Sequence, residues 1–338
     1  MKVKWRALVA LSSLLVLGAC SNDQSETENK DKELEKITFV LDWTPNTNHT
    51  GLYVAQQKGY FEEEGLDVEI VQPSDGDAST IVASGKAQFG ISAQDSLAPN
   101  YASDDSLPIT AVATVLQHNT SGIMSLKGEG IDRPKGLEGK TYATWDSPVE
   151  QATIANVMEK DGGDFEKVNL IPNNIVDEPM ALKEKQADAI WVFYGWGGVS
   201  AESEGVPIDY FYFKDLNPVF DYYTPVIISN DTFLKEHGDV AKKFLKAAEK
   251  GYEFAIESPE EAADILVEEA PELNKDLVLA SQKWLSEQYR ADEDRWGYID
   301  SQRWNDFYTW LGKNQLIDKE IPENTGFTND YLPSEQND

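Results

Sequence analysis

The sequence is poor in cysteine and histidine. Among its 338 residues it has one cysteine, Cys20, and three histidines, His49, His118 and His237. A single cysteine excludes an internal disulfide, and histidines so widely spaced without cysteine partners give no support for a zinc or iron site. No G-x-S-x-G nucleophile motif and no phosphate-binding loop is present. We therefore expect neither a metal nor a cofactor.

Basic residues are also scarce. The chain has 29 Lys and Arg against 60 Asp and Glu, a formal net charge of −31. Such a surface repels nucleic acid and anionic lipid headgroups, so we expect no nucleic-acid partner. With 60 acids, pairs of carboxylates arise by chance, and they give no weight to a glycosidase. We expect the protein to be a monomer.

No apolar run is long enough for a membrane span. The run over residues 7–17 follows Lys2, Lys4 and Arg6 and is shorter than the roughly 20 apolar residues that a bilayer requires. This arrangement predicts a signal peptide over residues 1–19. Its ending, Leu-Gly-Ala-Cys, resembles the lipobox of bacterial lipoproteins, which implies a lipid on Cys20 and a protein held on the extracellular side of the cell membrane. The charged segment 20–35 is expected to be a disordered tether.

Short β-rich runs alternate with helical segments in the rest of the chain, which is typical of α/β proteins. Helices are expected at residues 78–84, 149–160 and 179–185. From residue 231 to 312 successive amphipathic helices are expected, with Asp231 and Ser258 as N-caps. Strands are expected at residues 37–41, 66–71, 89–92, 109–115, 122–125, 140–143, 168–171, 189–193, 209–213 and 225–229.

The length of the chain favours two lobes over one core. The strands at 122–125 and 224–229 flank an α/β unit, so we expect one lobe from residues 36–125 and 224–330, a second lobe from 126–223, and a tail at 331–338. The chain would then cross between lobes twice, and such a two-strand hinge allows closure around a ligand. A single continuous sheet with decorations is the alternative.

Polar and aromatic side chains crowd into the loop that follows the first strand. Around Pro45, which forbids a regular ladder, lie Asp42, Trp43, Asn46, Asn48 and His49. An indole, two amides, an imidazole and a carboxylate at the end of a buried strand can stack on a flat heterocycle and bond to its edge. A well hydrogen-bonded turn is the alternative interpretation.

Six motifs resemble one family. They are LDWTPNTNHTGLYVAQQKGYFEEEGLDVEIV, ASGKAQFGISAQDSL, TSGIMSLKGEGI, KGLEGKTYATWDSPVEQATI, ADAIWVFYGWGG and DYYTPVIISNDTFL. The chain is similar, from about residue 36 to 311, to bacterial solute-binding lipoproteins that deliver thiamine pyrimidine precursors such as formylaminopyrimidine to ABC importers. Relatives in this superfamily bind riboflavin or alkanesulfonates, and fungal relatives are thiamine-pyrimidine synthases.

The resemblance implies a two-lobed α/β fold of the type II periplasmic-binding class, with the ligand in a cleft between the lobes and an ABC permease as partner. The implied ligand-binding residues come from loops at strand ends in both lobes. They are Asp42, Trp43, Asn46, His49, Gln94, Asp95, Asp146, Ser147, Pro148, Val149, Glu150, Trp191, Tyr194, Trp196 and Tyr222.

The chemistry of several of these residues suits an amino-substituted pyrimidine. Tryptophan and tyrosine rings offer stacking faces, Asp42 and Glu150 can accept from an exocyclic amine, and Asn46 and Gln94 can donate. Trp191 follows a buried-strand pattern, so core packing is an equal alternative for it.

Two departures from the family pattern bear on function. Relatives often carry an acid directly after the tryptophan equivalent to Trp196, where this chain has Gly197, and this leaves the exact ligand open. The lysine, histidine and cysteine motif of the fungal synthases would fall near Ser92, Asp95 and residues 221–225, and none of the three is present. We therefore expect a receptor rather than an enzyme. A receptor for riboflavin or a sulfonate and a synthase-like enzyme are the alternatives, although Lys and Arg are almost absent from the candidate loops.

Overall fold

The computed structural model describes residues 34–73 and 77–334. The expected signal peptide, Cys20 and nearly all of the expected tether lie outside the described residues. Within those ranges no helix has the length and apolar character needed to cross a membrane.

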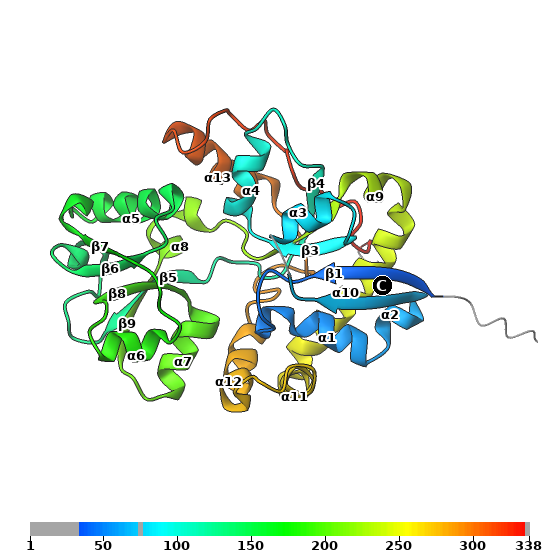
Figure 1. Ribbon diagram of the computed structural model, residues 1–338, viewed down its shortest axis with the longest axis horizontal. Helices are drawn as coiled ribbons and strands as arrows, with labels where there is room; N and C mark the ends of the chain where they lie inside the picture. The colour runs from blue at the N-terminus through cyan, green and yellow to red at the C-terminus, as the bar shows by residue number, and fades with distance from the viewer. Residues whose placement is uncertain (1–33, 74–76, 335–338) are drawn as a thin grey trace, which may run out of the picture. The chain divides into compact units, whose positions relative to one another are not determined.

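The described residues form two five-stranded mixed sheets, each covered by helices on both faces (Figure 1). The first sheet has the order β2-β1-β3-β10-β4, with β10 antiparallel to both neighbours, and the second has the order β7-β6-β8-β5-β9. We call the first sheet with its helices the first lobe and the second sheet with its helices the second lobe. The strands are β1 (Glu35–Val40), β2 (Leu66–Val71), β3 (Phe89–Ser92), β4 (Ile109–Thr114), β5 (Ser121–Leu126), β6 (Thr141–Thr144), β7 (Asn169–Pro172), β8 (Ala189–Phe193), β9 (Ile208–Tyr212) and β10 (Val226–Asn230).

All ten expected strands are present, with ends displaced by a residue or two, because each is a short apolar run bounded by turn residues. The sheet assignment of β5 differs from the expectation. Residues 122–125 were assigned to the first lobe, but β5 pairs antiparallel with β8 and β9 in the second sheet. The apolar run identified a strand, whereas its partners depend on long-range pairing. The first crossing between the lobes is therefore made by residues 115–120.

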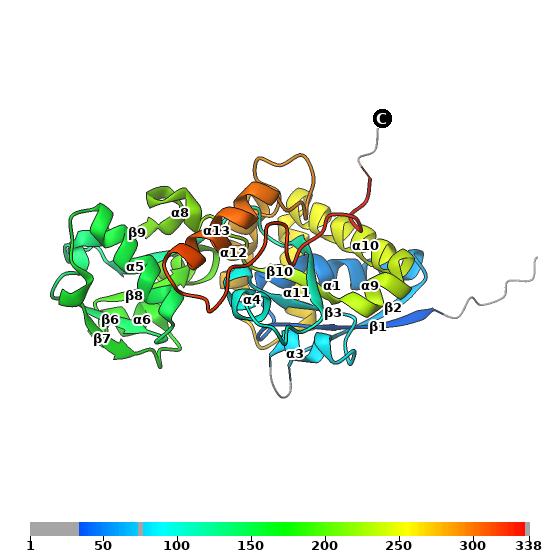
Figure 2. The same cartoon turned by 90° about the horizontal axis from the view of Figure 1, so that it is seen from above.

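Helices of the first lobe pack on both faces of its sheet, with α10 and α3 on opposite sides of β1 in Figure 2. Phe39 of β1 and Phe89 of β3 stack on Phe244 of α10 in one core cluster. Val40 packs with α3, α4 and α13 in the other. The helices of this lobe are α1 (Thr50–Gln57), α2 (Tyr60–Glu63), α3 (Ala78–Ala83), α4 (Gln94–Tyr101), α9 (Asp231–Glu236), α10 (Gly238–Glu257), α11 (Pro259–Glu269), α12 (Lys275–Ser286) and α13 (Ser301–Lys313).

The second lobe repeats this arrangement on a smaller scale. Ile123 and Met124 on β5 point to opposite faces and belong to separate core clusters, as the period of a strand requires. The helices of this lobe are α5 (Pro148–Lys160), α6 (Glu178–Lys183), α7 (Val199–Ser203) and α8 (Phe213–Leu216).

The helical character expected beyond residue 230 is confirmed, but one cap is corrected. Asn230, not Asp231, caps α9, because its side-chain oxygen accepts from the backbone of Thr232 and Phe233. Asp231 instead accepts from the Thr110 hydroxyl at 2.7 Å. Ser258 stands at the N-cap of α11 without a side-chain cap bond.

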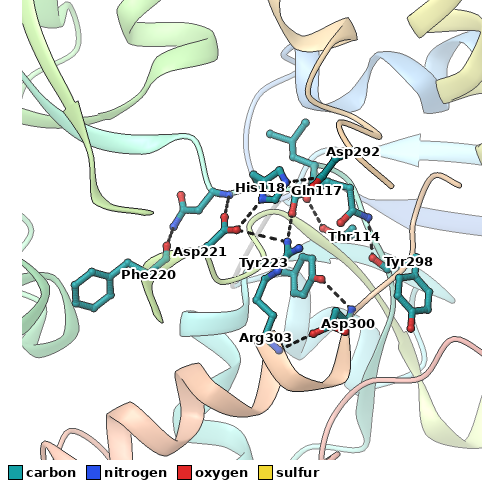
Figure 3. A network of polar contacts seen from close by, with 12 residues as sticks. Thr114, Gln117, His118, Phe220, Asp221, Tyr223, Asp292, Tyr298, Asp300 and Arg303 are labelled. Atoms are coloured by element: carbon teal, nitrogen blue, oxygen red, sulfur yellow. Dashed lines mark hydrogen bonds and ion pairs between the residues drawn. The ribbon is translucent and has the colours of Figure 1, made fainter. Parts of the chain in front are cut away.

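The two segments that cross between the lobes are joined by a polar network (Figure 3). The Asn119 backbone donates to Asp221 at 2.9 Å, and its side chain donates to the Phe220 carbonyl at 2.9 Å. Asp221 Oδ2 lies 2.6 Å from His118 Nδ1 and 3.7 Å from the Arg303 guanidinium on α13. The network therefore ties both crossing segments to each other and to the first lobe.

His118 lies between two carboxylates in this network. Its second ring nitrogen, Nε2, is 2.7 Å from Asp292, so both nitrogens find acceptors only when the ring is protonated. The hydrogen bond to Asp221 raises the pKa of His118 above its usual value, against the opposing effects of burial and Arg303.

We expect this histidine to make stability depend on pH. Because its folded-state pKa is raised, its contribution is fully present below the unfolded pKa of about 6.5 and is lost as pH rises through the folded pKa. The difference in unfolding free energy between wild type and His118→Gln should shrink between about pH 6 and pH 9. Urea unfolding across this range measures it, with His237→Gln at an exposed site as control. If wild type and His118→Gln differed in unfolding free energy by the same amount at about pH 6 and pH 9, the raised pKa of His118 would be contradicted.

Candidate functional site

A cavity of about 360 Å³ is lined by residues of both lobes. We call it the aromatic cavity, because four tryptophans contribute to its wall. The first lobe supplies the loop after β1, part of the first crossing segment and the end of α12, and the second lobe supplies the ends of β6, β7 and β8. The lining residues are Asp42, Trp43, Asn46, Thr47, Asn48, Leu116, Thr120, Trp145, Asn173, Ile175, Glu178, Trp191, Val192, Phe193, Gly195, Trp196, Gly197, Thr224, Pro225 and Leu285.

The loop after β1 is held rigid from behind. Asn46 caps the short helix η1 (Thr47–His49) by accepting from the Asn48 backbone. Tyr252 of α10 donates to the Asn48 carbonyl at 2.7 Å, and Tyr289 donates to the Thr47 carbonyl at 2.6 Å. These bonds from buried tyrosines fix the loop against the first lobe. A binding loop so fixed loses little conformational freedom when a ligand arrives.

Trp43 projects from this fixed loop and is 64% exposed. An indole left in water beside a cavity provides a stacking face without supporting the core. Asp42 beside it also lines the cavity, with Oδ1 2.9 Å from His49 Nε2. His49 Nδ1 accepts from the Asn46 backbone, so its Nε2 donates to Asp42. His49 therefore positions Asp42 from behind the loop and does not line the aromatic cavity.

The second lobe contributes the other three tryptophans. Trp145 follows β6 and is 50% exposed, and its ring centroid lies 6.1 Å from that of Trp191 on β8. Trp191 also packs on Phe213 at 4.1 Å. Trp191 is only 5% exposed, so it packs in the core of the second lobe and also forms part of the cavity wall.

Trp196 lies in η4 (Tyr194–Gly198), a π-helical turn that follows β8, and packs against the first lobe's core. In the same turn the Gly195 carbonyl accepts from the Ser281 hydroxyl of α12. Ser281 in turn lies 2.6 Å from the Thr47 hydroxyl. Because Ser281 donates to Gly195, Thr47 donates to Ser281. The hydroxyl chain links the loop after β1 to the turn that carries Trp196.

Position 197 cannot hold an acid in this backbone. A Cβ added to Gly197 would lie 2.9 Å from the Cβ of Val192, so any side chain there would displace a buried strand residue. Acidity in the cavity comes instead from Asp42 on the first lobe and Glu178 at the start of α6 on the second. The described lining includes no Lys or Arg. Burial, with a smaller contribution from Asp177, raises the pKa of Glu178.

Five of the predicted site residues meet in the aromatic cavity. They are Asp42, Trp43, Asn46, Trp191 and Trp196.

Glu150 was predicted to accept from a ligand amine, and the structure gives it another role. Its buried carboxylate accepts from the hydroxyls of Tyr142 and Thr144 and from the backbone of Trp145 and Ser147. These four donors occupy the carboxylate, and Ser147 and Glu150 together form the capping box at the start of α5. Glu150 therefore shapes the turn that presents Trp145 and does not line the cavity.

Three other predicted residues lie away from the cavity because partners within the protein occupy them. Gln94 is fully buried, accepts from the Tyr223 backbone and donates to the Trp304 carbonyl. Tyr222 stacks on Phe307 with ring centroids 4.2 Å apart. Tyr194 donates to Glu202 on the surface of α7.

The remaining predicted residues belong to the starts of two helices outside the cavity. Asp95 lies in the first turn of α4 and is half-buried, and burial raises its pKa. Ser92 lies at the end of β3 in a neighbouring hollow of about 430 Å³ that shares Asp42 with the aromatic cavity. At the start of α5 Asp146 accepts from Gln151, Ser147 and Pro148 form the cap, and Val149 packs on the first lobe's second core cluster.

Sequence reasoning missed several polar or aromatic lining residues, among them Trp145, Asn173 and Glu178 of the second lobe. Trp145 lies two residues after the strand predicted at residues 140–143, which is a usable signal. Asn173 and Glu178 lie around the start of α6 and resemble ordinary loop and first-turn residues. Among the described residues, no group of three His, Cys, Asp or Glu side chains is arranged to hold a metal ion.

Comparison with solved structures shows the fold. The alkanesulfonate-binding protein SsuA of Xanthomonas axonopodis pv. citri has a TM-score of 0.65 at 12% identity, covering 88% of this chain and 99% of that one. The desulfurization enzyme DSZB has a TM-score of 0.62 at 11% identity, covering 88% and 97%. These similarities confirm the two-lobed type II periplasmic-binding fold. A binding protein and an enzyme both have this fold, so the fold alone does not determine the activity, which depends on the residues of the site.

Comparison with curated sequences shows the family. A formylaminopyrimidine-binding protein of Halalkalibacterium halodurans is 31% identical over 335 residues, covering 96% of this chain and 98% of that protein. A 4-amino-5-hydroxymethyl-2-methylpyrimidine phosphate synthase of Saccharomyces cerevisiae is 27% identical, covering 88% of each. The model of a protein family described as "NMT1/THI5 like" matches residues 46–262 of this chain. The chain therefore belongs to the NMT1/THI5 like family.

Proposed function

We propose that this protein is the solute-binding component of an ABC importer and captures a thiamine pyrimidine precursor of the formylaminopyrimidine type. The ligand would bind in the aromatic cavity and be handed to the permease without chemical change. The observation that carries the proposal is the wall of this cavity, which combines four tryptophans and two carboxylates with no Lys or Arg among its described residues.

This wall suits a flat, amino-substituted ring. The tryptophans offer faces for stacking, and the carboxylates accept from N–H groups. A sulfonate carries a fixed negative charge, and two carboxylates without a cation would repel it. The alkanesulfonate alternative is thus disfavoured by the cavity itself, although the fold is shared.

The absence of enzyme chemistry is part of the same proposal. The synthase relatives would require a lysine, a histidine and a cysteine motif near Ser92, Asp95 and residues 221–225. Ser92 hydrogen-bonds Ser79, and within residues 221–225 Asp221 is engaged by His118 and Asn119. Ser92 therefore bonds to a neighbouring helix, and Asp221 belongs to the polar network that joins the two crossing segments. Structural contacts at positions where the synthases need reactive groups favour a receptor.

Calorimetry on the purified protein tests the ligand class directly. Formylaminopyrimidine or hydroxymethylpyrimidine should give saturable binding, whereas riboflavin and an alkanesulfonate should not. Saturable binding of only the latter pair would reverse the assignment, and product formation from a bound pyrimidine would refute the receptor role.

Trp43→Ala should weaken pyrimidine binding by about 1 to 3 kcal/mol, because stacking on one aromatic ring contributes about this much. The ring is largely exposed, so the free energy of unfolding should change little. Calorimetry measures the affinity and urea unfolding measures the stability. Trp43→Phe keeps a stacking face and should retain most of the affinity. Unchanged affinity in Trp43→Ala would remove this residue from the site.

We also propose that a lipid on Cys20 anchors the protein on the outer side of the cell membrane. The Leu-Gly-Ala-Cys ending and the preceding basic residues support this, and all lie outside the described residues. Globomycin should block processing of the wild type. Release of Cys20→Ala from the membrane fraction would support the anchor, and its retention there would contradict it.

A further inference from the structure

Glu178 is a half-buried carboxylate of the aromatic cavity for which the protein provides almost no partner. It is the first residue of α6, after the N-cap Asp177, and it lines the same cavity as Asp42 and Trp43. Among the described residues, the only hydrogen bond that lowers its pKa comes from its own backbone, and no cation contributes. A carboxylate withdrawn from water without a partner is costly to the protein.

Two other acids in or beside the cavity are engaged by the protein, Glu150 fully and Asp42 through one oxygen. Glu150 receives four donors and is closed to a ligand. Asp42 lines the same cavity, but one of its oxygens is bonded to His49. Among the described residues that line the cavity, Glu178 is therefore the acid that the second lobe contributes, and its carboxyl group has capacity left for a ligand.

We propose that Glu178 recognises the edge of a ring where an amino group stands beside a ring nitrogen, as in a 4-aminopyrimidine. This deepens the proposed function and rests on it. One carboxyl oxygen accepts from the amine, while the other shares a proton with the ring nitrogen. The two-point contact has the same geometry as the amide of Asn or Gln on the edge of adenine.

The surroundings of Glu178 favour the shared proton. Burial raises the pKa of its carboxyl group, and the neighbouring Asp177 raises it further, while only its own backbone N–H opposes them. Asp42 is the other carboxylate of the lining and has the same sign. The carboxyl group therefore keeps its proton to a higher pH than an exposed glutamate and can donate it to the ring nitrogen.

Two consequences separate this pairing from simple charge attraction. Binding should weaken as pH rises, by at most about tenfold per unit, because the shared proton is lost to solvent. Glutamine at this position donates from its amide at every pH. Glu178→Gln should therefore keep the two-point contact and lose the pH dependence, whereas Glu178→Ala loses both.

Calorimetry of the full chain between about pH 6 and pH 9 tests the inference. The probe is hydroxymethylpyrimidine, and the matched control ligand is its analogue with a methyl group in place of the amine. We expect Glu178→Ala to bind the probe about 10- to 100-fold more weakly and no longer to distinguish it from the analogue. Glu178→Gln should stay near the wild type with a flat pH profile. Glu184→Gln, an exposed acid at the end of the same helix, should match the wild type throughout.

The possible failures are distinguishable. If the wild type binds no aminopyrimidine, the proposed function and this inference both fall. If the wild type binds and Glu178→Ala binds equally well, only the role of Glu178 is refuted. If Glu178→Gln is as weak as Glu178→Ala, the contact needs the negative charge, and the edge pairing is wrong. Thermal unfolding of each variant confirms that a change in affinity does not arise from misfolding.

Discussion

Gly251→Ala should destabilise the protein by about 3 kcal/mol or more, the upper end of what overpacking costs. Gly251 lies on α10 where this helix crosses α1. A Cβ there would stand 2.0 Å from the Gly51 carbonyl oxygen and 3.0 Å from the Ala55 Cβ. The obstacle is backbone, so no side chain can rotate away, and the two helices must separate.

The crossing also bears on the site. α1 begins directly after η1, and Tyr252, next to Gly251, bonds the Asn48 carbonyl within the loop after β1. Separation of α1 from α10 would shift this loop, so ligand affinity should fall together with stability. A variant of a residue that only contacts the ligand would lower affinity alone.

The matched control is Gly312→Ala on α13. A Cβ at Gly312 would meet only the Glu320 side chain, at 3.8 Å. Alanine in a helix interior is favoured over glycine by up to about 1 kcal/mol, so this variant should be slightly stabilised. Urea unfolding of both variants measures the contrast. A Gly251→Ala protein as stable as the wild type would show that the helices are not in backbone contact.

Local sequence was sufficient to predict the strands and one wall of the cavity. Asp42, Trp43 and Asn46 follow a buried strand within five residues of one another, so their positions near a ligand depend only on that strand and its loop. The same holds for Trp196, whose neighbouring glycines permit a tight turn.

Residues whose partners are distant in the chain were not predictable in this way. Gln94 begins a helix at a strand end, as a ligand donor does, but its amide is used by Tyr223 and Trp304, 129 and 210 residues away. Conversely, Glu178 resembles an ordinary first-turn acid, and only the packing of the second lobe turns it into a wall of the cavity.

Glu150 is an intermediate case, because its role was visible in the sequence. Ser147 and Glu150 have the S-x-x-E spacing of a capping box, which assigns the carboxylate to the helix start. The resemblance assigned it to the ligand, and the local motif predicted its contacts better.

Glu150→Ala should destabilise the protein by about 3 kcal/mol or more, because two hydroxyls and two backbone N–H groups lose their shared acceptor. Removal of the carboxylate deprives the buried hydroxyls of Tyr142 and Thr144 and the backbone of Trp145 and Ser147 of their acceptor. Each such donor costs about 1 to 3 kcal/mol when left unpaired, less where water enters the gap.

The same variant should weaken ligand binding, since Trp145 lines the aromatic cavity and its backbone is held by Glu150. Glu150→Gln keeps the size of the side chain but replaces one acceptor with a donor that faces other donors, so an intermediate loss is expected. Glu159→Ala, an exposed acid on the same helix, should change stability by less than about 0.5 kcal/mol. Urea unfolding ranks the three variants. Removal of a residue that accepts from four donors within the protein must lower stability. If Glu150→Ala instead had the same unfolding free energy as Glu159→Ala but bound the ligand more weakly, Glu150 would be a ligand contact.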